Sequence, residues 1–205
     1  MKILLATNNG AKIERLKKLL RFIDFNMEVF SPSDLGIEII EVEESGATLT
    51  ENAEIKARAY LGNVNMPILA NDTGFYVEGE GFVDAPKRIA LGGASEKDLS
   101  KDEISKKILD FWKDVARKHG GAVDAAWIEA FVVVYPDGST ESICSRREII
   151  LTDQEFGIPH QQFPVRALYR AKATNKPAIC HTDEEEILEM KPVIGALMKV
   201  LRICA

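Results

Sequence analysis

Residues 68–77, which read ILANDTGFYV, are the stretch that decides the fold of this chain. The apolar run Ile68–Ala70 is typical of a buried strand, because it follows a proline that cannot easily continue a helix. The next three residues are polar and of turn-forming types, so we predict that the strand ends there and that the chain bends at Gly74. Phe75–Val77 then resumes an extended pattern. This arrangement places Asp72 at the exposed end of a buried strand.

Asp72 carries a charge that is costly to bury without a partner. It is therefore poorly placed to stabilise a core and well placed to hold a metal ion. The alternative interpretation is that Asn71, Asp72 and Thr73 are turn formers only. Taken alone, this stretch favours the alternative.

The composition predicts one folded domain over residues 1–205. Of these residues 46% are hydrophobic and 28% are charged, and no stretch rich in Gly, Pro or Ser divides the chain. Such values are ordinary for a globular protein with one sizeable core. The formal net charge of −6 argues against non-specific binding to nucleic acid, which relies on clustered Lys and Arg. A small polyanion that binds together with Mg²⁺ is compatible with this charge.

The cysteines and the apolar runs indicate the compartment. Cys144, Cys180 and Cys204 are scattered and odd in number, which fits a reducing cytosol better than a disulfide framework or a zinc site. The first residues contain too short an apolar run for a signal peptide, and no run approaches a membrane span. We therefore expect a cytoplasmic protein that does not bind membranes.

The N-terminal residues predict a strand, a tight loop and a helix. Lys2–Ala6 is a compact apolar run, residues 7–10 have turn chemistry, and Lys12–Phe22 carries apolar residues at helical spacing. Such a loop presents backbone N–H groups at the positive end of the helix dipole, and Lys12 adds a full charge, so phosphate is the natural ligand. The alternative is a plain turn with a solvated lysine, and spacing alone favours it because the loop is neither a P-loop nor GxGxxG.

The next segment combines clustered carboxylates with a helix start. Glu44 ends an acidic run whose members repel one another unless solvent or a cation relieves them, although such a run is usually a solvated edge. Residues 48–51 have the form of a capping box, so a helix should begin there and end near Gly62. Asn52 and Lys56 lie four residues apart on one face of this helix and point at a common site, unless Lys56 simply forms an exposed pair with Asn52 or Glu51.

The remaining elements follow from periodicity and turn signals. They are a strand at Glu28–Phe30, a helix at Ser95–Lys118, a hairpin of Ala130–Tyr135 and Glu141–Leu151 around the turn at 136–139, and a last helix from Thr182 to Leu201 with an interruption at Pro192.

Three motifs occur in one order: T-x-N-x-x-K after the first strand, E-S-G-x-T-x-x-E-N-A-x-x-K-A on the next helix, and N-D-T-G. Together they resemble the inosine triphosphate pyrophosphatase (Ham1-like) family, which hydrolyses non-standard nucleoside triphosphates. The residues that match are Thr7, Asn9, Lys12, Glu44, Gly46, Thr48, Glu51, Asn52, Ala53, Lys56, Ala57, Asp72, Thr73 and Gly74. The match is firm over about the first 80 residues and thin afterwards.

The resemblance implies an α/β fold with a mixed central sheet flanked by helices, two lobes with a cleft between them, and a homodimer. It also implies a triphosphate-binding loop, a Mg²⁺ ion on Glu44 and Asp72, phosphate neutralisation by Lys56, and Asp72 as the candidate base. The loop consists of Thr7, Asn8, Asn9, Gly10, Ala11 and Lys12, with Asn52 and Thr73 as further substrate-binding residues.

The chain also departs from the family pattern. Most members place an acidic residue at the position of Asn71, whose amide can ligate a metal but cannot take a proton. The usual S-A-R run is absent, with Lys87 or Arg88 as stand-ins, and FPVRA at 163–167 replaces the segment that holds the purine base. Phe163 and Arg166 therefore stand near the base. Lys191 is the obvious donor left where the family has S-H-R.

Two hypotheses follow. The first is Mg²⁺-dependent hydrolysis of a non-standard purine nucleoside triphosphate to the monophosphate and pyrophosphate, which cleanses the nucleotide pool. The second is a nucleotide-binding protein on the same fold with reduced or lost catalysis.

Overall fold

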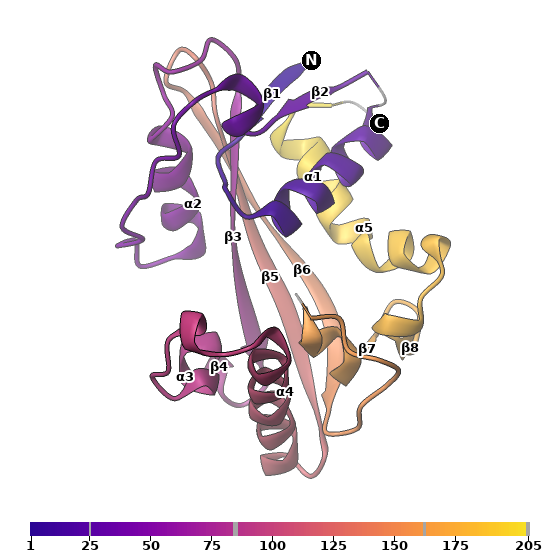
Figure 1. The fold of residues 1–205 in the computed structure, drawn as a ribbon. Coiled ribbons are helices and arrows are strands. Elements are labelled where there is room, and N and C mark those ends of the chain that lie inside the picture. Colours follow the sequence, from indigo (N-terminus) through magenta and orange to yellow (C-terminus); the bar gives the residue numbers. More distant parts are fainter. Residues whose placement is uncertain (25, 84–85, 162, 204–205) are drawn as a thin grey trace. The chain divides into compact units, whose positions relative to one another are not determined.

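The computed structural model describes residues 1–24, 26–83, 86–161 and 163–203, and it has a mixed α/β fold built on one sheet (Figure 1). The strand order is β2-β1-β3-β5-β6-β7-β8, and β4 pairs with β3. Strand β1 is parallel to β2 and β3, whereas the β3–β4, β6–β7 and β7–β8 pairs are antiparallel. The predicted fold class, a mixed central sheet flanked by helices, is therefore confirmed.

The strands are β1 Lys2–Leu5, β2 Glu28–Phe30, β3 Ile68–Val77, β4 Gly81–Phe82, β5 Ala122–Val134, β6 Thr140–Thr152, β7 Tyr169–Ala171 and β8 Lys176–Pro177. The α-helices are α1 Gly10–Ile23, α2 Leu49–Arg58, α3 Pro86–Leu91, α4 Lys101–Lys118 and α5 Asp183–Val200. Two compact units share these elements. The first contains Met1–Thr73, Ile128–Arg146 and Pro192–Ala205, and the second contains Gly74–Trp127 and Arg147–Lys191.

In the first unit, α1 and α2 lie on either side of β3 (Figure 1). Neighbouring side chains of a strand point to opposite faces, so a strand that is apolar throughout is covered on both faces. The residues between Ile3 and Ala6 are all buried, as this rule requires. The face toward α2 has a core of Leu4, Ala6, Ala53, Ala57, Tyr60, Ile68, Ala70, Val132 and Val134.

Helix starts in this unit follow the predicted caps. Asn9 is the N-cap of α1, and its side chain accepts a hydrogen bond from the backbone N–H of Lys12. Thr48 and Glu51 form the capping box expected for α2, each accepting from the backbone of the other. Helix α2 ends at Arg58, four residues before the predicted end at Gly62.

Strand β3 differs from its prediction. It runs without a break from Ile68 to Val77, so the predicted strand end and the bend at Gly74 are wrong. Asp72 lies inside the strand and is only 9% exposed, rather than standing at an exposed strand end. The turn propensity of these residues did not decide their conformation, because their polar side chains have partners within the fold. Asp72 forms an ion pair with Lys56, and Asn71 donates a hydrogen bond to Thr73 Oγ1.

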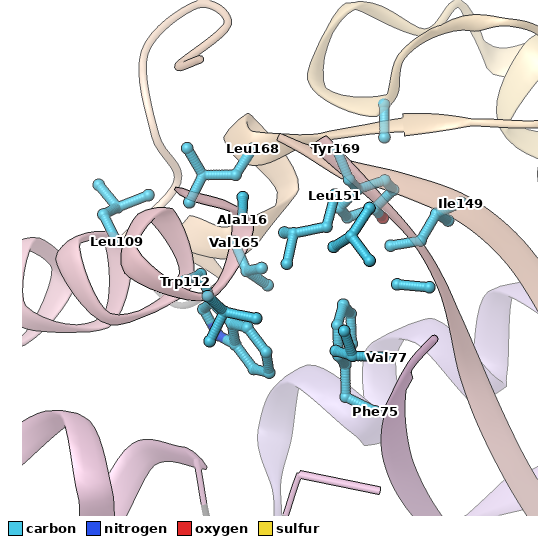
Figure 2. Close-up of a cluster of buried hydrophobic side chains, with 14 residues drawn as sticks. Phe75, Val77, Leu109, Trp112, Ala116, Ile149, Leu151, Val165, Leu168 and Tyr169 are labelled. Atoms are coloured by element: carbon cyan, nitrogen blue, oxygen red, sulfur yellow. The ribbon is translucent and has the colours of Figure 1, made fainter. Parts of the chain in front are cut away.

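The second unit has its own core, built around aromatic rings. Figure 2 shows Phe75 and Val77 of β3 facing Trp112 of α4 and the aliphatic residues of β6. The ring centroid of Phe75 lies 4.4 Å from that of Trp112 and 4.5 Å from that of Trp127. Leu109, Trp112 and Val115 of α4, which lie at helical spacing, thus belong to this core.

Three boundaries in the rest of the chain depart from prediction. Helix α4 begins at Lys101 and not at Ser95, because Ser100 and Glu103 form a capping box there. Strands β5 and β6 confirm the predicted hairpin and extend it to thirteen residues each. Helix α5 continues through Pro192, so the predicted interruption is wrong. Among the residues described, no helix has the length and apolar character needed to cross a bilayer.

The aromatic core predicts a clear difference between two phenylalanines of the second unit. Phe75→Ala should lower the free energy of unfolding by about 3–5 kcal/mol, because it removes a buried ring and leaves a cavity. Phe82→Ala removes a ring that is 59% exposed and should cost less than about 1 kcal/mol. Urea denaturation of both variants measures the difference, and equal costs would contradict the assignment of Phe75 to the core.

Candidate functional site

The first unit contains a cavity of about 380 Å³. Its wall comes from four segments: the loop after β1, the irregular segment before α2, the exposed turns of α2, and β3. The lining residues are Ala6, Thr7, Asn8, Asn9, Lys12, Ile40, Glu41, Val42, Glu44, Lys56, Tyr60 and Asn71. All of them belong to the first unit.

The loop between β1 and α1 supplies one side of this wall. Thr7 Oγ1 accepts from the backbone N–H of Asn9 at 3.2 Å, and Asn9 Oδ1 accepts from the backbone N–H of Lys12 at 3.1 Å. These bonds hold the loop against the first turn of α1, which begins with Gly10 and Ala11. A helix start of this kind carries partial positive charge and favours an anion in front of it.

The Lys56 ammonium group lies between two carboxylates. Its Nζ is 2.8 Å from Asp72 Oδ1 and 2.9 Å from Glu44 Oε2. The side chains of Lys56 and Asp72 are 16% and 13% exposed, whereas that of Glu44 is 49% exposed. Lys56 therefore does not form the exposed pair with Asn52 or Glu51 that was considered for it, whereas Glu44 is exposed, as expected for a solvated edge. The structure therefore brings together three charged residues that are separated in the sequence.

Lys12 belongs to the same group of charges. Burial is the main reason that the pKa of its ammonium group is lowered from the ordinary value of 10.5, and the positive charge of Lys56 lowers this pKa further. The carboxylate of Asp72 acts in the opposite direction. A cavity that holds two ammonium groups close together, one of them with a lowered pKa, is suited to a ligand with several negative charges.

Asn71 borders the cavity with an unsatisfied group. The residue is only 3% exposed, its Nδ2 donates to Thr73 Oγ1 at 3.3 Å, and its Oδ1 has no hydrogen-bond partner among the residues described. Strand β1 ends at Leu5, which pairs with Leu69, so Asn71 lies just beyond the part of β3 that pairs with β1. A buried acceptor without a donor is costly unless a ligand, a water or an ion completes it.

The oxygen atoms at this cavity suit a hard divalent cation. Within the described part of the chain, no three His, Cys, Asp or Glu side chains gather as a metal cluster. The available donors are the carboxylate of Glu44 and the amide oxygen of Asn71, which line the cavity, and the carboxylate of Asp72, which does not line it but meets Glu44 at Lys56 Nζ. Mg²⁺ is often held by one or two carboxylates and keeps several waters or phosphate oxygens, so this donor set fits it.

Asn52 has a structural contact. Its Oδ1 accepts from the backbone N–H of Gly46 at 2.8 Å, and it is not one of the residues that line the cavity. A Cβ atom on Gly46 would lie 2.6 Å from Glu51 Cβ, so only glycine fits this close approach. Asn52 and Gly46 thus hold the segment that carries Glu44 beside the start of α2.

Sequence reasoning missed Tyr60 and Ile40. The Tyr60 hydroxyl accepts from the backbone N–H of Ile40 at 3.1 Å, and both residues line the cavity. Tyr60 lies four residues after Lys56, so helical spacing was a signal that could have found it. No local pattern marks Ile40, because its place depends on a contact twenty residues away.

The other predicted substrate-binding residues belong to the second unit. Arg88 is exposed on α3, and Lys191 is exposed on α5. The Phe163 ring lies 5.3 Å from that of Trp127. Arg166 Nη2 lies 3.9 Å from carboxylate oxygens of both Glu186 and Glu189.

The burial of Lys12 predicts a stability effect. Lys12→Met should raise the melting temperature by a few degrees at neutral pH, because it removes an ammonium group whose charged form is disfavoured in the folded state. Because the pKa of Lys12 is lowered in the folded state, the unfolded chain binds more protons than the folded one, and the parent gains stability as the pH rises toward 10.5. The difference in melting temperature between Lys12→Met and the parent should therefore narrow over this range. Thermal unfolding from pH 7 to pH 10.5 measures both effects. Lys2→Met, at a side chain that is 60% exposed, is the control and should change little.

Comparison with known proteins adds to this geometry. The model of the Ham1 family matches residues 3–144. A dITP/XTP pyrophosphatase of Aquifex aeolicus (strain VF5) is 35% identical over 145 residues, which cover 66% of this chain and 64% of the relative. A dITP/XTP pyrophosphatase of Thermoanaerobacter sp. (strain X514) is 44% identical over 78 residues, which cover 38% of each chain. The matched segments thus span less than two thirds of these relatives.

A solved structure extends the likeness of the fold. The Ham1 protein of Staphylococcus aureus superposes with a TM-score of 0.70 at 21% identity, and the match covers 98% of both chains. At this level of identity the likeness supports the architecture alone. The mixed sheet with flanking helices is therefore shared well beyond the residues that the family model matches.

Proposed function

This chain belongs to the Ham1 family, and from that premise we propose that it hydrolyses non-standard purine nucleoside triphosphates to the nucleoside monophosphate and pyrophosphate, with Mg²⁺ as cofactor. The observation that carries the proposal is the placement of Lys56 between Glu44 and Asp72 in the cavity that Lys12 also lines. The relatives named dITP/XTP pyrophosphatase support the same class of reaction.

The triphosphate is proposed to lie against the loop of residues 7–12. Backbone N–H groups at the start of α1 and the ammonium group of Lys12 favour phosphate oxygens there. The positive charge of Lys56 contributes to the lowered pKa of Lys12, and a polyanion between the two ammonium groups removes that repulsion. The two lysines therefore neutralise the charge that develops on the departing pyrophosphate.

Glu44 and Asp72 are proposed to hold the Mg²⁺ ion, with Asn71 Oδ1 as a further oxygen donor at the same cavity. When bound, this ion supplies charge neutralisation on the phosphate oxygens and Lewis-acid polarisation of the reacting phosphoryl group. The amide of Asn71 cannot accept a proton at physiological pH, so it contributes to binding only.

Asp72 is proposed as the general base. In the ligand-free protein its Oδ1 accepts a hydrogen bond from Lys56, while its other oxygen can accept a proton. A water molecule that gives its proton to Asp72 attacks the α-phosphorus and breaks the bond to the oxygen that bridges the α and β phosphates. The products are the monophosphate and pyrophosphate, which leaves with the electron pair of the broken bond.

The remaining assignments stay predictions. Arg88, Phe163, Arg166 and Lys191 are expected to contact the substrate, and the homodimer implied by the resemblance is expected in solution. Arg166 can only donate hydrogen bonds, so it favours a base edge that offers acceptors such as a carbonyl oxygen.

Asp72→Asn tests the proposed base and metal ligand. We expect turnover to fall at least about a hundredfold, because an amide accepts no proton and binds a cation weakly. The measurement is pyrophosphate release from a panel of standard and damaged purine triphosphates with Mg²⁺. Asp34→Asn is the matched control, since Asp34 also pairs with a lysine of the first unit, Lys17, but this lysine does not line the cavity as Lys56 does. Equal activity of the Asp72 variant and the parent would overturn the assignment, and a folded parent without activity on the whole panel would remove the proposed function.

A second candidate function is nucleotide binding with reduced catalysis. The neutral Asn71, at a position where most relatives are expected to carry an acid, is the observation that favours it. Asn71→Asp should then raise turnover at least about tenfold in Mg²⁺, because a second carboxylate on β3 strengthens the metal site. Steady-state kinetics of the two proteins measure this change. An unchanged or lower rate, with nucleotide binding intact by calorimetry, would show that Asn71 does not limit catalysis.

A further inference from the structure

We propose that the Lys56 ammonium group is the resident cation of the Glu44–Asp72 pair, and that a divalent cation displaces it when it binds. Metal binding would then release Lys56 for the phosphates of the substrate. This inference rests on the metal site of the proposed function, and it adds an order to the events there. The protein should bind free metal poorly and a metal–polyphosphate complex well.

The geometry around Lys56 Nζ resembles that of a bound cation. Two carboxylate oxygens from different segments, Glu44 Oε2 and Asp72 Oδ1, approach this single atom at 2.9 Å and 2.8 Å. Asp72 is mostly buried, so its charge needs a compensating cation whenever the protein is folded without ligand. The lysine satisfies this need from within the chain.

A divalent ion and this ammonium group compete for the same place. Mg²⁺ binds carboxylate oxygens at about 2.0–2.1 Å, so an ion between the two oxygens would occupy the position that Nζ holds. Like charges at such short separation repel strongly inside a protein. The flexible four-carbon stem of Lys56 lets its charged end move away while its backbone stays fixed in α2.

The rest of the cavity gives the released ammonium group a destination only when a polyanion is present. Lys12 lines the same wall and already repels Lys56. Moving Lys56 toward Lys12 is unfavourable in an empty cavity, and it becomes favourable once phosphate oxygens lie between them. Metal and polyphosphate should therefore strengthen each other's binding, which is a positive coupling between two ligands.

Asn71 fits this balance. The carboxylates of Glu41 and Glu44 line the cavity together with the ammonium groups of Lys12 and Lys56, and Asp72 pairs with Lys56 beside it. The neutral amide of Asn71 adds no further negative charge, whereas an acid there would draw a free divalent cation into the cavity. The unsatisfied Oδ1 of Asn71 remains available as a donor after the exchange.

The first experiment titrates Mn²⁺ into the full-length, nucleotide-free protein and follows free Mn²⁺ by electron paramagnetic resonance. Lys56→Met should bind Mn²⁺ at least tenfold more tightly than the parent, because the competing ammonium group is gone. Lys12→Met removes a charge of the same sign from the same cavity, but not the one between the carboxylates, so its affinity should change clearly less. Equal tightening in both variants, or no binding by any of the three proteins, would overturn the proposal.

The second experiment needs no substitution. Limited acetylation of the parent protein, read by mass spectrometry, should modify Lys56 slowly without metal and at least threefold faster with saturating Mn²⁺. Lys113 is the internal control, since it forms a single ion pair with Glu155 and is 19% exposed, close to the value for Lys56. A Lys56 rate that does not change with Mn²⁺ would contradict displacement. Neither readout depends on turnover, so a failure of the proposed hydrolysis would appear separately, in the triphosphate panel.

Discussion

The ion pair between Lys56 and Asp72 is the interaction on which the first unit depends. A carboxylate in the middle of a buried strand is strongly unfavourable by itself, and it is tolerated here because an ammonium group approaches it at 2.8 Å. The lysine is supplied by α2, whose small residues Ala53 and Ala57 allow the helix to pack closely over β1 and β3. Packing of apolar surface thus brings the two charges together, and the charges in turn allow β3 to continue past its apolar segment.

The same pair explains why the sequence singled out Lys56 and Asp72 correctly and predicted the end of β3 wrongly. Asn71, Asp72 and Thr73 are turn-forming types, and local propensity alone predicts that the strand ends with them. The partner of Asn71 is Thr73, two residues later, whereas the partner of Asp72 is Lys56, sixteen residues earlier. Only the contact with Lys56 allows the charge of Asp72 to be buried. Other signals that act within a few residues were interpreted correctly. The capping box of α2 and the hairpin of β5 and β6 are examples, because in each the partners lie close together in the chain.

The second unit shows what such signals cannot reveal. Glu189 is 3% exposed and accepts from Arg147 Nη1 at 2.7 Å and from the Tyr169 hydroxyl at 3.2 Å, while His181 Nδ1 lies 3.3 Å from its other oxygen. Burial, together with the charge of Glu189, raises the pKa of Tyr169 to about 12. In the sequence Glu189 follows the acidic first turn of α5, and no local pattern marks it as buried. Its partners lie 42, 20 and 8 residues away, so no spacing rule could have selected it.

This contrast bears on how much of the family's chemistry the chain retains. The solved Ham1 structure superposes over 98% of the chain at 21% identity, whereas the family model matches residues 3–144. A core tolerates many apolar substitutions as long as pattern and volume persist, so the fold survives where identity is lost. A site for phosphate and metal does not tolerate such substitutions, because Lys56 or Asp72 cannot be replaced by a residue of similar size with different charge. The buried network of Glu189 belongs to the second unit and shares no residue with the cavity of the first, so it is a separate feature of this chain.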